Sequence, residues 1–154
     1  MVFRDANEND FERVHELMYQ IFKKHLLRRP DIYQDGDPYT LKQYASTLNN
    51  ENEMIILAEK DNVVVGLCHM SKKDHRNNPT LKNKYTVFIE DFCVDKDYYR
   101  QGIGRALYNE AIRRAKMWNA SSLELNVWEV NKEARKFYDA VGLKVKSTHM
   151  ETKL

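Results

Sequence analysis

The sequence predicts one α/β domain over residues 1–154, with a mixed central sheet of about six to seven strands flanked by about four helices. Apolar residues alternate in some segments and recur every three or four positions in others, which separates strands from helices. Two glycines one residue apart, Gly102 and Gly104, stand between an apolar strand-like run and a helical pattern. The length suits one domain with a real core and is short for two.

The chain is expected to begin with a short strand, Val2 to Asp5, followed by an amphipathic helix. Apolar positions between 11 and 26 recur at spacings of three and four, which is typical of a helix with one buried face. His15 and His25 lie off the centre of that apolar stripe, so we expect them at the surface. Pro30 ends the helix, because the residue before a proline avoids helical dihedral angles.

Residues 31–39 form a loop that is rich in proline and aspartate, and residues 41–48 predict a second, shorter helix. Loops held by a rigid scaffold often form binding sites. The three aspartates of the loop could face a cationic substrate, but a solvated turn, in which aspartate is common, is the favoured explanation. They are Asp31, Asp35 and Asp37.

Three strands are predicted next, at 53–59, 63–70 and 85–94, with a polar, basic loop before the third. The first two are joined by Lys60-Asp61-Asn62, which is typical of a hairpin. Cys68, His69 and His75 are candidate ligands for a metal ion. Adjacent residues of a strand point to opposite faces, and no further ligands are suitably placed, so no metal is expected.

The second half of the chain alternates helix and strand. A helix follows Gly102 and Gly104, a strand covers 123–127, and a helix capped by Asn131 ends at Gly142. Lys144 to Leu154 is expected to be the final strand.

Composition favours a soluble protein of the cytoplasm. Charged residues make up 31% of the chain and hydrophobic residues 42%. The net charge of +2 gives no case for nucleic-acid binding. The two cysteines, Cys68 and Cys93, fall in predicted buried strands, and the polar N-terminus lacks a signal sequence. No stretch is long enough to span a membrane.

The turn around Gly102 and Gly104 predicts an anion site. The first N–H groups of a helix have no intrahelical partner, and the helix dipole adds partial positive charge there. Glycine lets a phosphate approach the backbone, while Arg100 and Arg105 add charge beside it. A glycine pair alone is weak evidence, because it can simply shape a turn. The spacing fits neither the dinucleotide fingerprint nor the P-loop.

Two motifs together carry a family resemblance. Residues 91–95 and 98–107, reading DFCVD and YYRQGIGRAL, resemble the acetyl-coenzyme A motif of the GNAT superfamily of N-acetyltransferases. Residues 131–143 resemble the later helix of the same family, and the order of elements agrees over nearly the whole chain. One position departs from the pattern: Tyr99 stands where the family has Gln or Arg.

The resemblance implies an acetyl-coenzyme A site and a sheet that is splayed in its middle. The pyrophosphate would lie on the backbone of the glycine turn, and the pantetheine arm along the end of the preceding strand. Asn131 and Ala134 would contact the cofactor from the last helix. The implied cofactor-binding residues are Phe92, Cys93, Val94, Arg100, Gln101, Gly102, Ile103, Gly104, Arg105, Asn131 and Ala134.

The implied reaction is direct transfer of acetyl to a primary amine, which must first lose a proton. Glu90 and Asp91 interrupt an apolar strand, and being adjacent they should point to opposite faces, so that one reaches the cleft. By resemblance to polyamine-type members we choose Glu90 as the base, the alternative being a charge at the open strand edge. Tyr138 matches the family tyrosine beside the sulfur, although its place on the apolar stripe would also suit the core. The backbone N–H of Val94 would stabilise the oxyanion.

The substrate stays open at this point. A small cationic amine or polyamine is favoured, and a protein or peptide amine is the rival. The first helices and the loop at 71–84 are expected to wall the acceptor cleft. A non-catalytic acyl-coenzyme A sensor is a further alternative. Because the family commonly dimerises and a final strand would present an open edge, a homodimer is expected.

Overall fold

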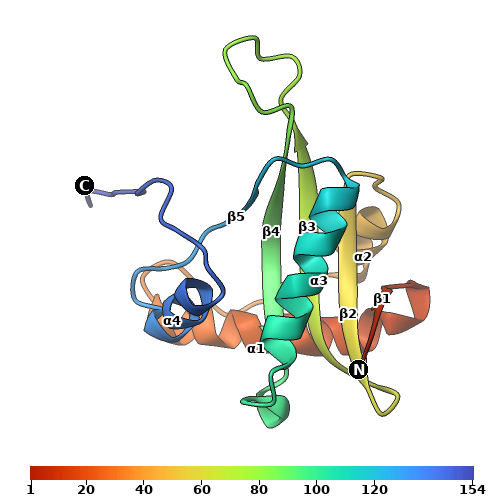
Figure 1. The fold of residues 1–154 in the computed structure, drawn as a ribbon. Helices are drawn as coiled ribbons and strands as arrows, with labels where there is room; N and C mark the ends of the chain where they lie inside the picture. The colour runs from red at the N-terminus through yellow and green to blue at the C-terminus, as the bar shows by residue number, and fades with distance from the viewer.

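The computed structural model describes all of residues 1–154, and its elements surround one mixed sheet (Figure 1). The strand order is β1-β2-β3-β4-β5, antiparallel throughout except for the parallel pair of β4 and β5. The strands are β1 (Val2–Asp5), β2 (Glu53–Lys60), β3 (Val63–Asp74), β4 (Tyr85–Val94) and β5 (Leu123–Leu125). The helices are α1 (Phe11–Arg28), α2 (Leu41–Leu48), α3 (Ile103–Met117) and α4 (Lys132–Ala140), with short 3₁₀ turns η1 (Glu8–Asp10) and η2 (Lys96–Tyr98). The predicted mixed α/β class and the four helices are confirmed, but the sheet has five strands rather than six or seven.

The predicted final strand is wrong. Residues 144–154 have no regular structure and extend away from the sheet (Figure 1). A strand needs a paired edge and a face to bury, and this segment has neither: no backbone hydrogen bond links it to β5, and Val145 and Met150 are 78% and 83% exposed. Side chains anchor it instead, since Lys146 pairs with Glu124 at 2.6 Å.

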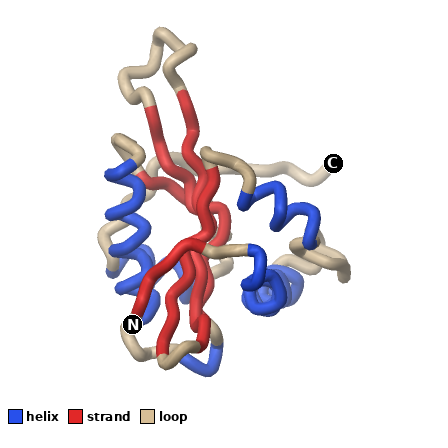
Figure 2. The backbone as a smooth tube through the Cα atoms, turned by 90° about the vertical axis from the view of Figure 1, so that its right-hand side faces the viewer, coloured by secondary structure: helices blue, strands red, loops and turns tan.

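Helices cover both faces of the sheet, with α3 on one side and α1 and α2 on the other (Figure 2). The α3 core holds Leu107 and Met70, both fully buried, and the opposite core holds Leu17 and Leu67. Each such side chain contributes about 1.5–3 kcal/mol relative to exposure. Cys68 belongs to the α3 core while His69 faces the other side, as strand alternation predicts.

Local sequence accounts for the helix starts and for the β2–β3 hairpin. Asn7 caps η1, and Thr40 forms a capping box with Gln43 at the start of α2. Asp61 and Asn62 have φ angles of 51° and 63°, the left-handed pair that a tight hairpin requires. The hairpin expected from the sequence is therefore confirmed.

The sheet opens between β4 and β5. Pairing of these strands runs only from Val87 opposite Leu123 to Ile89 opposite Leu125. β4 continues to Val94, so its last five residues have no partner strand on that side. This open length of β4 ends directly before the turn that leads into α3.

Candidate functional site

The turn between β4 and α3 presents the start of a helix to solvent. Gly102 is the N-cap of α3, with φ 78° and ψ −1°, and Arg100 also has a positive φ of 62°. The backbone N–H groups from Gln101 to Arg105 form no hydrogen bond within the chain. Successive free N–H groups and the helix dipole make this turn suited to an anion.

Cationic side chains from other elements reach the same turn. Lys60, at the end of β2, donates a hydrogen bond to the Gln101 side chain at 2.8 Å. Tyr99 receives a hydrogen bond from Lys24 of α1, whose ammonium lies 4.7 Å from the centre of the tyrosine ring. At the position where the sequence departs from the family pattern, Tyr99 thus ties the turn to α1.

Gly104 has a different role from Gly102. A Cβ at Gly104 would lie 3.3 Å from the ring of Phe137 in α4, and 3.7 Å from Val94. That ring stacks on Phe92 of β4, with centroids 5.7 Å apart. The absence of a side chain at Gly104 therefore lets α4 lie close to the start of α3 and to the open length of β4.

Backbone groups of β4 face the opening in the sheet. The N–H of Asp95 donates to Val65 of β3 at 2.8 Å, and backbone groups of an antiparallel strand alternate in direction. Cys93 therefore faces β3, whereas Phe92 and Val94 direct their N–H and C=O groups away from it. A ligand lying in the opening can use these groups as a further strand would.

The two carboxylates of β4 share one pocket, contrary to the expectation that one would face away. A β-bulge explains this. His69 pairs with Asp91 and the next residue, Met70, pairs with Ile89, so Glu90 is an extra residue on β4. Both acidic side chains consequently lie on the α1 face of the sheet and line the same cavity.

Glu90 is held in place by two neighbours on β3. Ser71 donates a hydrogen bond to its carboxylate, and the Lys73 ammonium lies 2.9 Å away. Burial raises the pKa of Glu90, but these two partners outweigh burial and lower it overall. Glu90 is therefore an oriented, ionised carboxylate at neutral pH.

His69 is a site residue that the sequence argument used only to reject a metal. Its ring is buried between two carboxylates, with Nε2 3.0 Å from Glu53 and Nδ1 3.4 Å from Asp91. Burial lowers the pKa of His69, but hydrogen bonds to Asp91 and Glu53 outweigh it and raise the pKa overall. The antiparallel register of β2, β3 and β4 brings the three residues together, and no spacing along the chain indicates it.

A cavity of about 400 Å³ lies in front of these carboxylates. It is formed by α1, the loop before α2 and β4. His25, expected at the surface, lines this cavity and stacks on Tyr33 with centroids 5.5 Å apart. Burial lowers the pKa of His25, so its ring is neutral at pH 7.

Tyr138 lies on α4 and packs against the open length of β4. Its ring contacts Phe92 at 6.4 Å and Phe137 at 5.4 Å between centroids, and its hydroxyl forms no hydrogen bond. Burial raises the pKa of Tyr138, and the charge of Asp91 adds to the shift. Tyr138 is thus a neutral hydrogen-bond donor at physiological pH.

Asn131 caps α4, as predicted. Its side chain accepts a hydrogen bond from the backbone N–H of Ala134 at 3.2 Å. Gly142, with φ 96°, follows the helix. The Leu143 N–H donates a hydrogen bond to the backbone carbonyl of Tyr138 at 3.0 Å, which closes the end of the helix. Both helix ends are therefore fixed by the residues that the sequence indicated.

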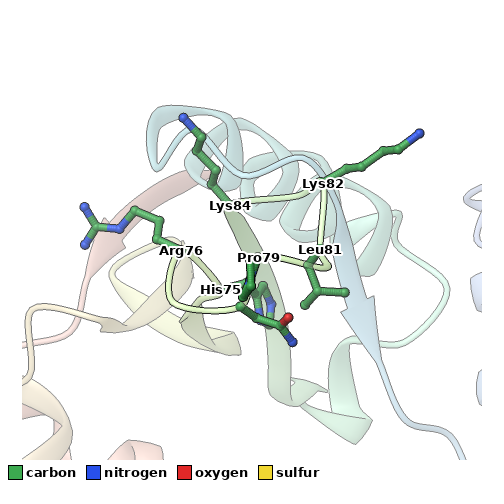
Figure 3. Close-up of a pocket in the computed structure, with 7 residues that line it drawn as sticks. His75, Arg76, Pro79, Leu81, Lys82 and Lys84 are labelled. Carbon is green, nitrogen blue, oxygen red and sulfur yellow. The ribbon is translucent and has the colours of Figure 1, made fainter.

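The loop at 75–84 lies at the far tip of the β3–β4 hairpin rather than beside the acidic pocket (Figure 1). It encloses a separate hollow of about 340 Å³, and its basic side chains point outward in different directions (Figure 3). Their ends do not converge on a common point: those labelled include Arg76, Lys82 and Lys84. Residues 71–84 were expected to wall the acceptor cleft, but none of them lines the acidic cavity. Ser71 and Lys73 reach it only through their contacts with Glu90.

The three aspartates of the 31–39 loop do not line the acidic cavity. Asp31 pairs with Arg29 at 2.8 Å, Asp37 contacts His15 at 3.0 Å, and Asp35 accepts from the Gly36 N–H. Turn chemistry and local ion pairs account for them. No cluster of three or more His, Cys, Asp or Glu side chains has a metal-binding arrangement, and none of the helices has the length and apolar character needed to cross a bilayer.

The model of the acetyltransferase (GNAT) family matches residues 12–143, which is most of the sequence. The chain belongs to the GNAT family of acetyltransferases. The resemblance drawn from residues 91–107 and 131–143 is confirmed, and with it the assignment of this GNAT protein as an N-acetyltransferase. The family uses acetyl-coenzyme A as acetyl donor.

Relatives and solved structures agree with this membership. An uncharacterized N-acetyltransferase from the pepI 3' region of Lactobacillus delbrueckii subsp. lactis is 25% identical over 127 residues, covering 76% of this chain and 72% of the relative. A variant of the BH1408 protein from Bacillus halodurans has a TM-score of 0.94 at 26% identity, covering 100% of this chain and 99% of that one. The aminoglycoside N-acetyltransferase AAC(6')-Iy in complex with CoA has a TM-score of 0.75 at 15% identity, with 99% and 98% covered, and shares the fold.

Proposed function

We propose that this GNAT protein transfers acetyl from acetyl-coenzyme A to the primary amine of a small cationic molecule. The observation that carries the proposal is the open length of β4, which connects an anion-binding turn at one end with a pair of carboxylates at the other. The phosphates of a thioester cofactor would bind at the turn, and a cationic amine would bind at the carboxylates. Because both sites lie on one strand, the thioester and the amine can meet between them.

Coenzyme A fits the first end. The pyrophosphate would accept hydrogen bonds from the backbone N–H groups of residues 101–105, with Arg100 and Arg105 adding charge. The pantetheine arm would pair with Phe92 and Val94, on either side of Cys93, while Asn131 and Ala134 would contact it from α4. The free N–H groups and the unpaired strand edge support this placement.

Glu90 is proposed as the base. It takes one proton from the substrate ammonium, through water where needed, and this frees the nitrogen lone pair to attack the thioester carbonyl carbon. Asp91, which is positioned by the His69 ring 3.4 Å away, holds the ammonium beside Glu90. The N–H of Val94 would stabilise the oxyanion, because it faces the open side of β4.

Tyr138 is proposed as the acid. When the carbon–sulfur bond breaks, its electron pair stays on sulfur, and the Tyr138 hydroxyl protonates the thiolate. The second proton of the attacking nitrogen replaces the one that Tyr138 gave. The products are coenzyme A as a thiol, an acetamide and one proton on Glu90.

Thiol release from acetyl-coenzyme A, measured over a panel of small amines and peptides, tests this function. We expect turnover on small amines, loss of turnover in Glu90→Gln and unchanged affinity of that variant for coenzyme A. Turnover on peptides alone would replace the small acceptor by a protein amine. Coenzyme A binding without any turnover would make the protein a sensor instead.

We also propose a cytoplasmic homodimer. Both cysteines are free, which suits a reducing compartment, and the three-residue strand β5 leaves a sheet edge that a second copy can cover. Light scattering after size-exclusion chromatography measures the mass in solution. A monomer at micromolar concentration would remove the dimer.

A further inference from the structure

The walls of the acidic cavity are apolar and aromatic. On the α1 side they consist of Met18, Ile21 and Phe22, and on the side of the loop before α2 they include Tyr33 and Tyr39. The volume of about 400 Å³ lies within the range of small-ligand sites, which usually combine apolar walls with a few placed polar groups.

Aromatic rings brace this wall. Tyr33 contacts Phe22 edge-on at 6.4 Å, stacks on His25 at 5.5 Å and meets Trp128 at 6.2 Å between centroids. The indole N–H of Trp128 also donates to the Tyr33 hydroxyl at 3.3 Å. Side chains held by several neighbours keep their rotamers, so the apolar wall is formed before a ligand arrives.

Negative charge in the cavity is confined to one place. Glu90 and Asp91 are adjacent on β4 and are the only charged side chains in its lining, because His25 is neutral. The loop aspartates add no second anionic point, because Asp31 pairs with Arg29 and Asp37 accepts a hydrogen bond from the Tyr39 N–H. The cavity thus offers a single site for a cation.

We infer that the acceptor is a monoamine, that is, one primary ammonium carried on an apolar and preferably aromatic body. The ammonium would lie at Glu90 and Asp91, and the body would lie against Phe22 and Tyr33. A polyamine or an aminoglycoside would bring further charged or hydroxyl groups against this wall, where they lose hydration without gaining partners. The inference rests on the proposed function and narrows its substrate class.

The test compares two acceptors that share a terminal primary amine, 2-phenylethylamine and 1,4-diaminobutane. The monoamine is expected to have at least a tenfold higher kcat/KM, because its ring is desolvated against the wall while the second ammonium of the diamine is not accommodated. Equal values, or a preference for the diamine, overturn the inference while leaving amine acetylation intact.

Variants of the wall sharpen the test. Phe22→Leu keeps most of the volume and is expected to raise KM for 2-phenylethylamine severalfold without changing KM for acetyl-coenzyme A. Phe22→Glu places a second carboxylate in the wall and should shift the preference towards 1,4-diaminobutane. The matched control is Leu27→Ala on the same helix, which is 81% exposed and outside the cavity.

Failure of the inference and failure of the proposed function give different results. If the wall is misread, Phe22→Glu leaves the ratio of the two kcat/KM values unchanged while both amines are still acetylated. If the function is misread, neither amine releases thiol. In that case calorimetry with 2-phenylethylamine in the presence of coenzyme A detects no amine binding, and both conclusions fall.

Discussion

Replacing Gly102 by alanine is expected to destabilise the domain by about 1–2 kcal/mol, the cost of the left-handed conformation for a residue with a Cβ. Gly102 begins α3 with φ 78°, and a Cβ added there would meet no atom within 4 Å. The cost therefore comes from the local backbone conformation, and packing against other parts of the fold adds nothing to it. Because 1 kcal/mol shifts the melting temperature by about 2–4 °C at this chain length, the loss should be about 2–8 °C.

Thermal unfolding followed by far-UV circular dichroism measures this loss without any ligand. Gly102→Asn should lose less, because asparagine tolerates the left-handed region. Gly36→Ala is the matched control, since Gly36 has open space around it and no positive φ. If Gly102→Ala and Gly36→Ala melt within a degree of each other, the argument that the turn requires glycine is wrong.

Three other changes probe the sheet and the site. Gly66→Ala would place a Cβ 2.8 Å from the carbonyl oxygen of Cys93, a backbone atom of β4, so urea unfolding should show a loss at the upper end of the 1–3 kcal/mol of overpacking or beyond. The raised pKa of His69 stabilises the fold fully below its unfolded pKa of about 6.5, and this stability is lost as pH rises through the folded pKa. The stability advantage of wild type over His69→Gln should therefore shrink as pH rises above neutrality, and a constant difference in denaturant midpoint across that range would contradict the linkage. Tyr138→Phe should slow acetyl transfer by roughly a hundredfold, the lower end of the range for one proton-transfer group. Its free energy of unfolding should stay within about 0.5 kcal/mol of wild type, because the Tyr138 hydroxyl has no hydrogen-bond partner. A loss of stability large enough to account for the slower rate would assign Tyr138 to the core alone.

Local rules sufficed for most of the fold. The periodicity of α1, the capping residues Thr40 and Asn131, and the glycine at the start of α3 each act within a few positions of the chain. The periodicity reflects a buried apolar stripe, the caps satisfy N–H groups that have no partner in the helix, and the glycine permits a positive φ. Single residues and their spacing are enough to predict all three. The sequence therefore predicts both the position of the glycine turn and its place between β4 and α3.

The acidic site depended on pairing that no local rule contains. A bulge at Glu90 sets the direction of Asp91, and its position follows from the register of β3 against β4. The same register places His69 between Glu53 and Asp91, residues separated by 16 and 22 positions from it. Strand alternation alone therefore assigned Asp91 to the wrong face and left His69 without a role.

The predicted final strand is wrong for a related reason. Residues 144–154 carry β-branched and apolar residues, and sequence propensity alone favours a strand. β-propensity reflects packing on a sheet, and the side chains of this segment meet no sheet surface. Such a segment becomes a strand only if another strand offers it an edge to pair with. The residues of the segment themselves do not show whether that edge exists.

Calorimetric titration of coenzyme A tests the central claim, that the turn before α3 binds the pyrophosphate. The account predicts one molecule bound per chain, and affinity lowered roughly tenfold, or about 1.4 kcal/mol, by each of Arg100→Glu and Arg105→Glu. Lys82→Glu, on the remote hairpin loop, changes net charge equally and should leave affinity unchanged. No binding by wild type, or equal losses in all three variants, would contradict the claim.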